Sequence, residues 1–310
     1  MSILVTGGAG FIGSNIVDVL IERGYQVAVL DDLSTGFREN INPKAKFYEA
    51  SVCDGRAVAG VFEQEKPDFV SHQAAQIDVR KSVDDPVFDA DVNIVGGLNI
   101  ITNAAKSGVK KIVYASTVAV YGEPQSLPVA ESHQIEPTSP YGISKHTVER
   151  YLCLYSVLYG LKFTALRYPN VYGPRQNPHG EAGVVAIFVN RLLEGEQPTI
   201  YGDGEQTRDY AHVYDVVEAN ISALTRGDNK AYNIGTGIET SVNETFLRIS
   251  KALRSDLTAL HAQERAGEIR RMVLDASRAR TELGWTPKFN FEDGVSQTAQ
   301  YYRERTKPKE

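Results

Sequence analysis

Short apolar runs alternate with longer segments of helical period through the first half of the chain. The apolar runs predict strands at residues 3–6, 26–32, 46–49, 68–72 and 111–116. The periodic segments predict helices at residues 12–23, 55–66, 86–107 and 141–159. Because strand and helix alternate, we expect right-handed crossovers and a parallel sheet with helices on both faces. The pattern therefore predicts an α/β fold built on a doubly wound parallel sheet.

The turn after the first predicted strand carries Gly7, Gly10 and Gly13. Glycines at this spacing let the backbone approach a diphosphate without a β-carbon in the way, while the N–H groups of the helix start face the anion. The second predicted strand ends in Asp31 and Asp32, and Asp31 lies 18 residues after Gly13. An acid there binds the adenosine ribose hydroxyls and repels a 2′-phosphate, which favours NAD over NADP. A structural glycine turn is the alternative, but this order of elements favours a Rossmann-type nucleotide site.

The composition and net charge of the chain indicate that its binding partner is a small molecule. Of the 310 residues, 42% are hydrophobic and 23% are charged, and a net charge of only −6 gives no basis for capture of nucleic acid. Cys53 and Cys153 form no disulfide framework and no CxxC pair, as is typical of a reducing cytoplasm. No apolar run reaches the roughly 18 residues that a membrane span needs, and the chain starts with a predicted strand in place of a charged leader. We therefore expect a cytoplasmic protein that binds neither membrane nor metal.

A second group of candidate residues follows the fifth predicted strand, which ends at Ser116 and Thr117. Tyr141 and Lys145 lie four positions apart at the head of a predicted helix, so their side chains share one face. A nearby cation, together with the positive charge of a nicotinamide, favours the Tyr141 phenolate, and a pKa lowered by ~3 units corresponds to ~4 kcal/mol. Ligands of such sheets bind beyond the carboxyl ends of the strands. These residues are therefore candidates for proton transfer beside the cofactor.

Other polar positions also lie near the predicted pocket. His72 ends the fourth predicted strand, where a structural role is favoured over catalysis. The small residues within Gln73–Gln76 let the backbone pass close to the pyrophosphate or the nicotinamide ribose. Asn93 is either a buried polar bridge or a surface residue, and the small residues around it favour the bridge.

The motifs TGGAGFIG, STVAVYG, YGISK and RYPNVYGPR resemble those of the extended short-chain dehydrogenase/reductase family. Within that family the chain is similar to the nucleotide-sugar 4-epimerases of UDP-glucose/UDP-galactose type, over residues 1–305. The resemblance implies that Thr117, Tyr141 and Lys145 are the catalytic residues. It also implies NAD-dependent inversion at C4 of a UDP-hexose, through a transient 4-keto sugar and hydride return to the opposite face.

The same resemblance implies which residues contact the two ligands. For NAD they are Gly7, Gly10, Phe11, Ile12, Gly13, Asp31, Asp32, Ser34, Thr35, Gly36, Ser51, Val52, Gln73, Ala74, Ala75, Gln76, Asn93, Ser116, Tyr141, Lys145 and Tyr168. For the UDP-sugar they are Thr117, Tyr141, Asn170, Val184, Val185, Tyr201, Arg208, Arg265 and Glu268. Ser51 departs from the family pattern, which usually has Asp beside the adenine, and Met272 occupies the position that gates the sugar pocket.

The resemblance also implies a domain organisation and an assembly. Residues 1–168 form an NAD-binding Rossmann domain that carries the catalytic residues, and later segments near 205–230 return to it. Residues 169–310 form a smaller mixed α/β domain that mainly binds the nucleotide sugar. The family habit is a homodimer through the helices near residues 90–107 and 141–159.

Related enzymes that begin with the same oxidation are the main alternatives. A nucleotide-sugar 4,6-dehydratase or a UDP-glucuronate decarboxylase places proton-transferring residues directly after the catalytic Thr, where this chain has Val118 and Ala119. A uronate 4-epimerase tends to have Thr in place of Asn170. A non-catalytic NAD-sensing protein would be expected to lose Tyr141 or Lys145, and both are present. The sequence favours the UDP-hexose 4-epimerase and leaves open whether the sugar is N-acetylated and whether the base is that of UDP or dTDP.

Overall fold

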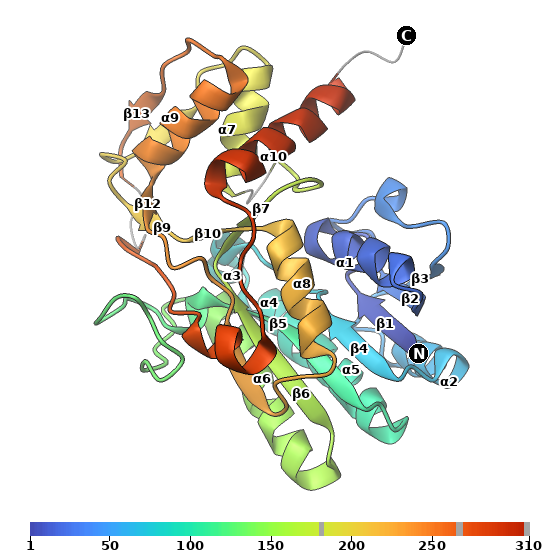
Figure 1. Cartoon of the computed structure of the whole chain (residues 1–310). Helices are drawn as coiled ribbons and strands as arrows, with labels where there is room; N and C mark the ends of the chain where they lie inside the picture. The colour runs from blue at the N-terminus through green and yellow to red at the C-terminus, as the bar shows by residue number, and fades with distance from the viewer. Residues whose placement is uncertain (180–182, 265–268, 307–310) are drawn as a thin grey trace.

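The computed structural model of the chain describes residues 1–179, 183–264 and 269–306. Its centre is a seven-stranded sheet in the order β11-β6-β5-β4-β1-β2-β3, in which every neighbouring pair is parallel (Figure 1). The sheet strands are β1 (Ser2–Thr6), β2 (Gln26–Asp31), β3 (Lys46–Glu49), β4 (Phe69–His72), β5 (Lys111–Thr117), β6 (Lys162–Tyr168) and β11 (Lys230–Asn233). The order runs outward in both directions from β1 and β4, which confirms the predicted doubly wound parallel sheet.

Helices surround the sheet and also form a separate group in the C-terminal part of the chain. The α-helices are α1 (Phe11–Glu22), α2 (Gly55–Glu65), α3 (Val79–Asp84), α4 (Pro86–Ala90), α5 (Gly96–Lys106), α6 (Pro140–Tyr159), α7 (Val184–Leu193), α8 (Val213–Ala223), α9 (Val242–Leu253) and α10 (Phe291–Thr306). The short helical turns are η1 (Arg38–Asn40), η2 (Asp91–Val95), η3 (Val118–Val120) and η4 (Ala279–Leu283), of which η2 and η4 are π-helical. Within the described ranges no helix combines the length and the apolar content that a membrane crossing requires.

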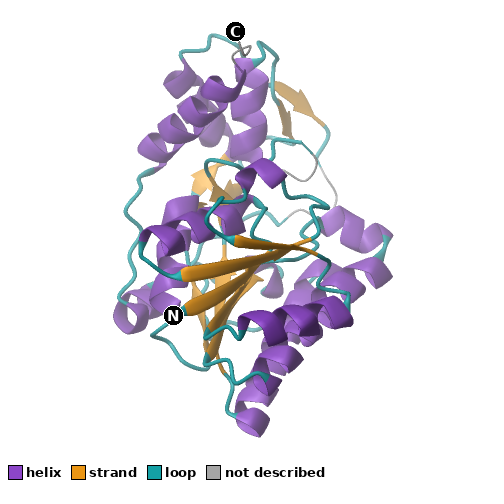
Figure 2. Ribbon diagram, turned by 90° about the vertical axis from the view of Figure 1, so that its right-hand side faces the viewer, coloured by secondary structure: helices purple, strands orange, loops and turns teal. Residues whose placement is uncertain are grey.

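Both faces of the sheet are covered by helices (Figure 2). On one face α1 and α8 pack on Ile3 and Val5 of β1. On the other face α2, α5 and α6 pack on Leu4, which lies between Ile3 and Val5 in β1. Successive side chains of a strand point to opposite faces, so a strand buried on both sides has to be continuously apolar. The apolar run at the start of the chain is therefore the direct cause of the two-sided burial of β1.

The helical region predicted at residues 86–107 is present and contains a π-turn. It begins as α4, passes through the π-helical turn η2 and continues as α5. A short helix that the periodicity did not indicate, α3, precedes it, and the Asp78 side chain caps α3 by accepting a 2.8 Å hydrogen bond from the Lys81 N–H. A π-turn inserts one residue into one turn, and the hydrophobic period does not reveal such an insertion. The predicted helical region at residues 86–107 is therefore confirmed, and only the π-turn within it was not indicated by the sequence.

A separate hydrophobic core lies in the C-terminal part of the chain. It joins α7, α9 and α10 through residues such as Phe188, Phe246 and Val295, and Figure 1 shows these helices as a lobe above the sheet. The remaining strands form three two-stranded sheets: β7 (Asn170–Tyr172) with β10 (Tyr210–His212), β9 (Thr207–Arg208) with β12 (Thr240–Ser241), and β8 (Thr199–Tyr201) with β13 (Leu260–Ala262). α8 and β11 return to the main sheet. The division into domains at residue 168 stays a prediction.

Candidate cofactor site and active site

The glycine turn between β1 and α1 is so tightly closed that side chains do not fit. Gly7 has φ of +69°, and a β-carbon on it would lie 2.6 Å from the backbone nitrogen of Ala74. A β-carbon on Gly13 would lie 2.1 Å from the carbonyl oxygen of Gly7. Both approaches are to backbone atoms, which cannot rotate away, so these positions require glycine. Gly10 caps α1, whose N-terminus faces the same turn and can attract an anion.

Replacing Gly13 by Ala is expected to remove bound NAD, because the new β-carbon forces the Gly7 carbonyl out of the turn. Such overpacking costs about 1–3 kcal/mol, which corresponds to a loss of about 5- to 150-fold in NAD affinity. NAD titration and thermal unfolding measure the two effects. Gly60→Ala on α2 is the matched control, because nothing lies within 4 Å of its β-carbon position. NAD affinity equal in Gly13→Ala and wild type would contradict this description of the turn.

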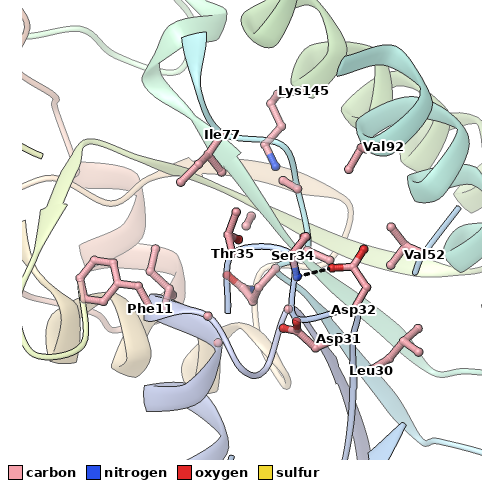
Figure 3. Close-up of a pocket in the computed structure, with 18 of the residues that line it drawn as sticks. Phe11, Leu30, Asp31, Asp32, Ser34, Thr35, Val52, Ile77, Val92 and Lys145 are labelled. Atoms are coloured by element: carbon pink, nitrogen blue, oxygen red, sulfur yellow. Dashed lines mark hydrogen bonds between the residues drawn. The ribbon is translucent and has the colours of Figure 1, made fainter. Parts of the chain in front are cut away.

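A pocket opens above the glycine turn, at the carboxyl ends of β1, β2, β4 and β5 (Figure 3). Most of the residues predicted for NAD line it: Gly7, Gly10, Phe11, Ile12, Gly13, Asp31, Asp32, Ser34, Thr35, Val52, Gln73, Ala74, Ala75, Ser116, Tyr141, Lys145 and Tyr168. The lining also includes residues that the sequence analysis did not single out: Leu30, Ala50, Ile77, Val92 and Ala115. Four predicted residues, Gly36, Ser51, Gln76 and Asn93, do not line the pocket.

The two carboxylates after β2 occupy different environments. Asp31 is 8% exposed, and its two oxygens accept hydrogen bonds of 2.9 Å from the Ala9 N–H and 2.8 Å from the Leu33 N–H. Burial raises the pKa of Asp31, and both backbone hydrogen bonds oppose that rise. Asp32 is exposed and accepts a 3.0 Å hydrogen bond from the Ser34 N–H (Figure 3). Asp31 therefore braces the glycine turn, and Asp32 adds a solvent-facing carboxylate to the pocket.

Tyr141 and Thr117 meet where β5 ends and α6 begins. Thr117 is the last residue of β5, and Tyr141 lies in the first turn of α6. Their side chains interact, and the Thr117 hydroxyl favours the ionised form of Tyr141. Lys145, one turn further along α6, is 3% exposed; its ammonium lies 4.8 Å from the centre of the Tyr114 ring and points into the pocket (Figure 3). The structure thus brings together the three residues that the sequence predicts for catalysis.

The protonation of these residues depends most on their burial. In the chain by itself, burial raises the pKa of Tyr141 to about 12, and the Thr117 hydroxyl opposes the rise. Burial also lowers the pKa of Lys145 to about 7, and the negative charges of Asp89 and Glu149 oppose that shift. The predicted lowering of the Tyr141 pKa includes the positive charge of a bound nicotinamide, so it stays a prediction. The sequence argument counted the cations near the phenol and left out the desolvation of a buried phenolate.

His72 and Asn93 have the structural roles that the sequence favours. His72 is 2% exposed and its Nδ1 lies 2.7 Å from a threonine hydroxyl of β1; burial lowers its pKa to about 3, so the ring stays neutral. The Asn93 side-chain amide donates hydrogen bonds of 3.0 Å to the Gln76 carbonyl, Asp89 and Ser144. Its oxygen accepts a 2.9 Å hydrogen bond from the Gln76 N–H. Asn93 therefore bridges the loop after β4 to α4 and α6.

Two residues of the pocket lining are held by a third residue behind them. Asn220 of α8 donates a 2.8 Å hydrogen bond to the Tyr168 hydroxyl and accepts one of 3.1 Å from the Gln73 side-chain amide. The Tyr168 hydroxyl in turn donates to the Gln73 side-chain oxygen at 3.3 Å. The three side chains close a triangle, which fixes the orientation of the Gln73 amide at the pocket wall.

A buried ion pair that the sequence analysis did not assign supports the end of β5. Glu149 on α6 and Arg167 on β6 are 4% and 5% exposed, and the guanidinium donates two hydrogen bonds to the carboxylate, at 3.0 and 2.6 Å. Glu149 also accepts a 2.5 Å hydrogen bond from the Ser116 hydroxyl, and Arg167 donates one of 2.8 Å to the Tyr121 hydroxyl. The available signal for Glu149 was its position four residues after Lys145, on the same helix face.

Asn170 and Arg208, both predicted substrate residues, lie near each other. Asn170 begins β7, and its N–H donates a 3.1 Å hydrogen bond to the carbonyl of Asp209, the residue after Arg208. The Asp209 carboxylate is buried and accepts hydrogen bonds of 2.6 to 3.2 Å from donors in residues 236–237 and from the Leu274 N–H. This carboxylate therefore ties the β9–β10 connection to two other loops.

The other predicted substrate residues lie on separate segments. Tyr201 ends β8. Val184 and Val185 begin α7, and Val185 is fully buried in the C-terminal core. Arg265 and Glu268 fall outside the described residues.

The parallel doubly wound sheet, with a glycine turn after β1 and acids after β2, is the fold of a Rossmann-type dinucleotide-binding protein. Comparison with known sequences identifies the particular family. The chain belongs to the NAD dependent epimerase/dehydratase family, whose profile matches residues 3–235. The predicted family and its cofactor, NAD, are thereby confirmed.

Full-length relatives support the same assignment. The UDP-glucose 4-epimerase of Mycolicibacterium smegmatis is 43% identical over 313 residues, which is 99% of this chain and 100% of the relative. The structure of the Thermotoga maritima UDP-glucose 4-epimerase with UDP-glucose is 48% identical, covers 98% of this chain and 99% of its own, and has a TM-score of 0.97. The Thermus thermophilus UDP-glucose 4-epimerase in complex with NAD is 45% identical, with the same coverage of 98% and 99% and a TM-score of 0.94.

Proposed function

We propose that the protein is an NAD-dependent 4-epimerase of UDP-hexoses, of the UDP-glucose/UDP-galactose type. The observation that carries the proposal is the placement of Tyr141 and Lys145 in the lining of the pocket above the glycine turn, with Thr117 at the adjoining end of β5. The bacterial relatives described above bear the name of this activity and match nearly the whole chain, which supports the same assignment here.

The pocket residues fit NAD. Gly7 and Gly13 leave the backbone bare where a diphosphate would approach, and Asp31 and Asp32 place carboxylates where ribose hydroxyls would bind. The Lys145 ammonium lies at the pocket wall near the end of β5, where it can donate a hydrogen bond to a ligand. When bound, NAD supplies a hydride acceptor that can return the same hydride.

In the proposed mechanism Tyr141 acts as the base and Lys145 stabilises its anion. The Tyr141 phenolate takes the proton of the sugar 4-hydroxyl as the hydride leaves C4, so that a C4=O double bond forms. Thr117 hydrogen-bonds the same hydroxyl and orients it toward Tyr141. After the 4-keto sugar turns its other face, hydride returns to C4 and Tyr141 gives the proton back to the oxygen. The O–H and C–H bonds broken in the first half of the reaction are formed again in the second half, so the net change is inversion at C4.

Inversion requires that the nucleotide stay bound while the hexose turns. We propose that Asn170 and Arg208 hold the diphosphate, a role that suits a forked guanidinium, and that Tyr201 stacks on the base. Val184 and Val185, at the start of α7, contact the nucleotide sugar in this proposal. Arg265 and Glu268 complete the nucleotide site. The backbone hydrogen bond from Asn170 to Asp209 supports the first part, because it joins the start of β7 to the residue directly after Arg208.

The alternative reactions need a proton-transferring side chain after Thr117. Val118 and Ala119 occupy those positions in the turn η3, and the Ala119 N–H donates a 3.2 Å hydrogen bond to the Thr117 hydroxyl. Neither side chain can carry out an elimination or assist decarboxylation. This favours the epimerase over a 4,6-dehydratase or a UDP-glucuronate decarboxylase.

The test is product analysis with the protein as purified and without added NAD. UDP-galactose and UDP-N-acetylgalactosamine are incubated separately, and the products are resolved by chromatography. Appearance of the gluco epimer supports the proposal, and the relative rates identify the sugar. If neither substrate is converted even after NAD is added, the proposal is wrong for UDP-hexoses, and dTDP-sugars and uronates become the next substrates.

We also propose a homodimer through the helices near residues 90–107 and 141–159, which are η2, α5 and α6, together with the neighbouring α4. Large apolar side chains are exposed there: Val87 by 77%, Val95 by 45%, Ile143 by 51%, Leu154 by 47% and Val157 by 82%. α4 and η2 both pack against α6, so these side chains belong to one region of the surface. An exposed apolar region of this kind is typical of an interface between copies of a chain.

Replacing Val157 by Asp is expected to weaken the dimer by about tenfold or more, because the carboxylate would be buried without a partner in each half of the interface. Sedimentation velocity over a range of concentrations measures the dissociation constant. Leu247→Asp on α9, at a side chain 65% exposed in the C-terminal lobe, is the matched control and should leave it unchanged. A monomeric wild-type protein would refute the homodimer.

We further propose a cytoplasmic location. Cys53 and Cys153 are both free of disulfide bonds, which suits a reducing compartment. Fractionation of cells that make the protein, followed by immunoblotting, tests this, and recovery outside the cytoplasmic fraction would contradict it.

A further inference from the structure

Asp89 is a buried carboxylate with only one of its two oxygens satisfied. It lies on α4 and is 1% exposed. Its Oδ1 accepts hydrogen bonds of 2.9 Å from the Gln76 side chain and 3.0 Å from the Asn93 side chain. Its Oδ2 is buried and has no hydrogen-bond partner. Gln76 and Asn93, predicted as cofactor contacts, thus lie behind the pocket and hold this carboxylate. A buried charge left in this state is strongly unfavourable unless an opposite charge faces it.

Lys145 supplies a positive charge that acts on Asp89 from the neighbouring helix, although within the described residues no direct salt bridge joins the two side chains. α4 packs directly against α6, which carries Lys145, and the two side chains interact electrostatically. Glu149 is the other acid that acts on Lys145, but Arg167 already neutralises it through two hydrogen bonds. The remaining titratable neighbours, Tyr114 and Tyr141, carry no positive charge. His72, which also faces the ammonium, is neutral for the reason given above.

Asp89 is also linked to the turn that carries Tyr141. Asn93, which donates to Asp89, donates at the same time to the Ser144 hydroxyl at 3.0 Å. The Ser144 hydroxyl in turn donates a 3.0 Å hydrogen bond to the Tyr141 carbonyl. One chain of hydrogen bonds therefore runs from the carboxylate to the backbone of the proposed base.

We propose that Asp89 is the buried counter-charge of Lys145, a positioning residue that holds the ammonium at the pocket and keeps the first turn of α6 in place. The roles of Tyr141 and Lys145 in catalysis rest on the proposed function, whereas the electrostatic coupling of Asp89 and Lys145 does not. Its test therefore has one arm that needs no activity.

The first arm is a double-mutant cycle on unfolding, with Asp89→Asn, Lys145→Met and the double variant measured by urea denaturation at one saturating NAD concentration. We expect the equilibrium constant of unfolding in the double variant to be lower by about tenfold or more than the product of the two single effects predicts. Additivity within about twofold overturns the pair. Asp84→Asn, an exposed carboxylate on α3, is the matched control and should be additive with Lys145→Met.

Failure to fold is itself informative in this cycle. If Asp89→Asn alone does not fold but the double variant does, removal of the stranded ammonium has rescued the fold, as the proposal requires. If Lys145→Met folds and both variants that carry Asp89→Asn fail to fold, Asp89 acts independently of Lys145 and the proposal is wrong.

The second arm is the pH dependence of UDP-galactose conversion. Burial dominates the pKa values of Tyr141 and Lys145, and the negative charge of Asp89 raises both. Turnover needs Tyr141 without its proton and Lys145 with its own, so the pKa values of the two groups set both limbs of the profile, and Asp89→Asn should move both limbs to lower pH. A change in packing alone would lower the rate without this displacement. If the two limbs of the pH profile stay in place in Asp89→Asn, the proposal is contradicted. If the wild-type protein shows no turnover, the proposed function is refuted, and the unfolding cycle still decides whether Asp89 and Lys145 are coupled.

Discussion

Tyr141→Phe is expected to lower the rate of epimerisation by about 10²- to 10⁴-fold, the usual contribution of a positioned general base. The substitution removes the one oxygen that meets both Thr117 and the proposed 4-hydroxyl, and it leaves the ring packing in place. The NAD content and the thermal stability should therefore remain close to those of wild type. Initial rates with UDP-galactose, measured with excess NAD, give the effect on kcat.

A second phenol on the same helix provides the control for this substitution. Tyr159 lies at the other end of α6 and is 63% exposed, so Tyr159→Phe should leave kcat unchanged. A Tyr141→Phe variant that retains more than about a tenth of wild-type turnover would remove Tyr141 from the role of general base.

Glu149→Gln is expected to lower the free energy of unfolding by about 3–5 kcal/mol, the usual effect of breaking a buried ion pair. The amide leaves the buried Arg167 guanidinium without its carboxylate and weakens the hydrogen bond to Ser116. Urea unfolding with NAD at a fixed concentration measures the difference. Glu196→Gln, which breaks the exposed pair with Arg191, is the matched control and should cost less than about 1 kcal/mol. Equal losses of unfolding free energy in the two variants would contradict the claim that the buried ion pair stabilises the fold more than the exposed one.

The same pair predicts the direction of a pH effect. Although burial alone would raise the pKa of Glu149, hydrogen bonds from His146 and Arg167 lower it to about 2, from 4.5. A carboxylate whose pKa is lowered by folding contributes stability above its unfolded pKa, and that contribution is lost as the pH falls toward the folded value. The stability difference between wild type and Glu149→Gln should therefore be full above pH 4.5 and shrink between pH 4.5 and about 2. A difference that grows on acidification would have the wrong sign.

Five of the seven strands of the main sheet, β1 to β5, were predicted from their short apolar runs, whereas β6 and β11, which lie later in the chain, were not predicted. β1 and β5 are short, apolar and bounded by polar or glycine residues, and the structure places them within one residue of the predicted ends. The interruption of the helix at η2 and the short helix α3 were not predictable. Both depend on local hydrogen bonds, such as the Asp78 cap and the amide of Asn93, and neither changes the hydrophobic period.

The candidate site was predictable where chemistry is tied to the end of a strand. The glycines after β1, the acids after β2, and the group formed by Thr117 and Tyr141 all meet at one pocket because parallel strands end on one side of a sheet. The sequence did not indicate which side chains from distant positions pack together behind that pocket. The partners Asp89 and Lys145 lie on different helices, 56 positions apart in the chain, and only the packing of α4 on α6 brings them together.

The most direct test of the central claim, inversion at C4 by removal and return of one hydride, uses UDP-galactose with deuterium at C4 and the protein as purified. The account predicts UDP-glucose that retains the deuterium at C4 with no hydrogen taken from solvent, because the hydride never leaves the site between its two transfers. Loss of the label to water, or a product that has lost its 6-hydroxyl, would contradict it.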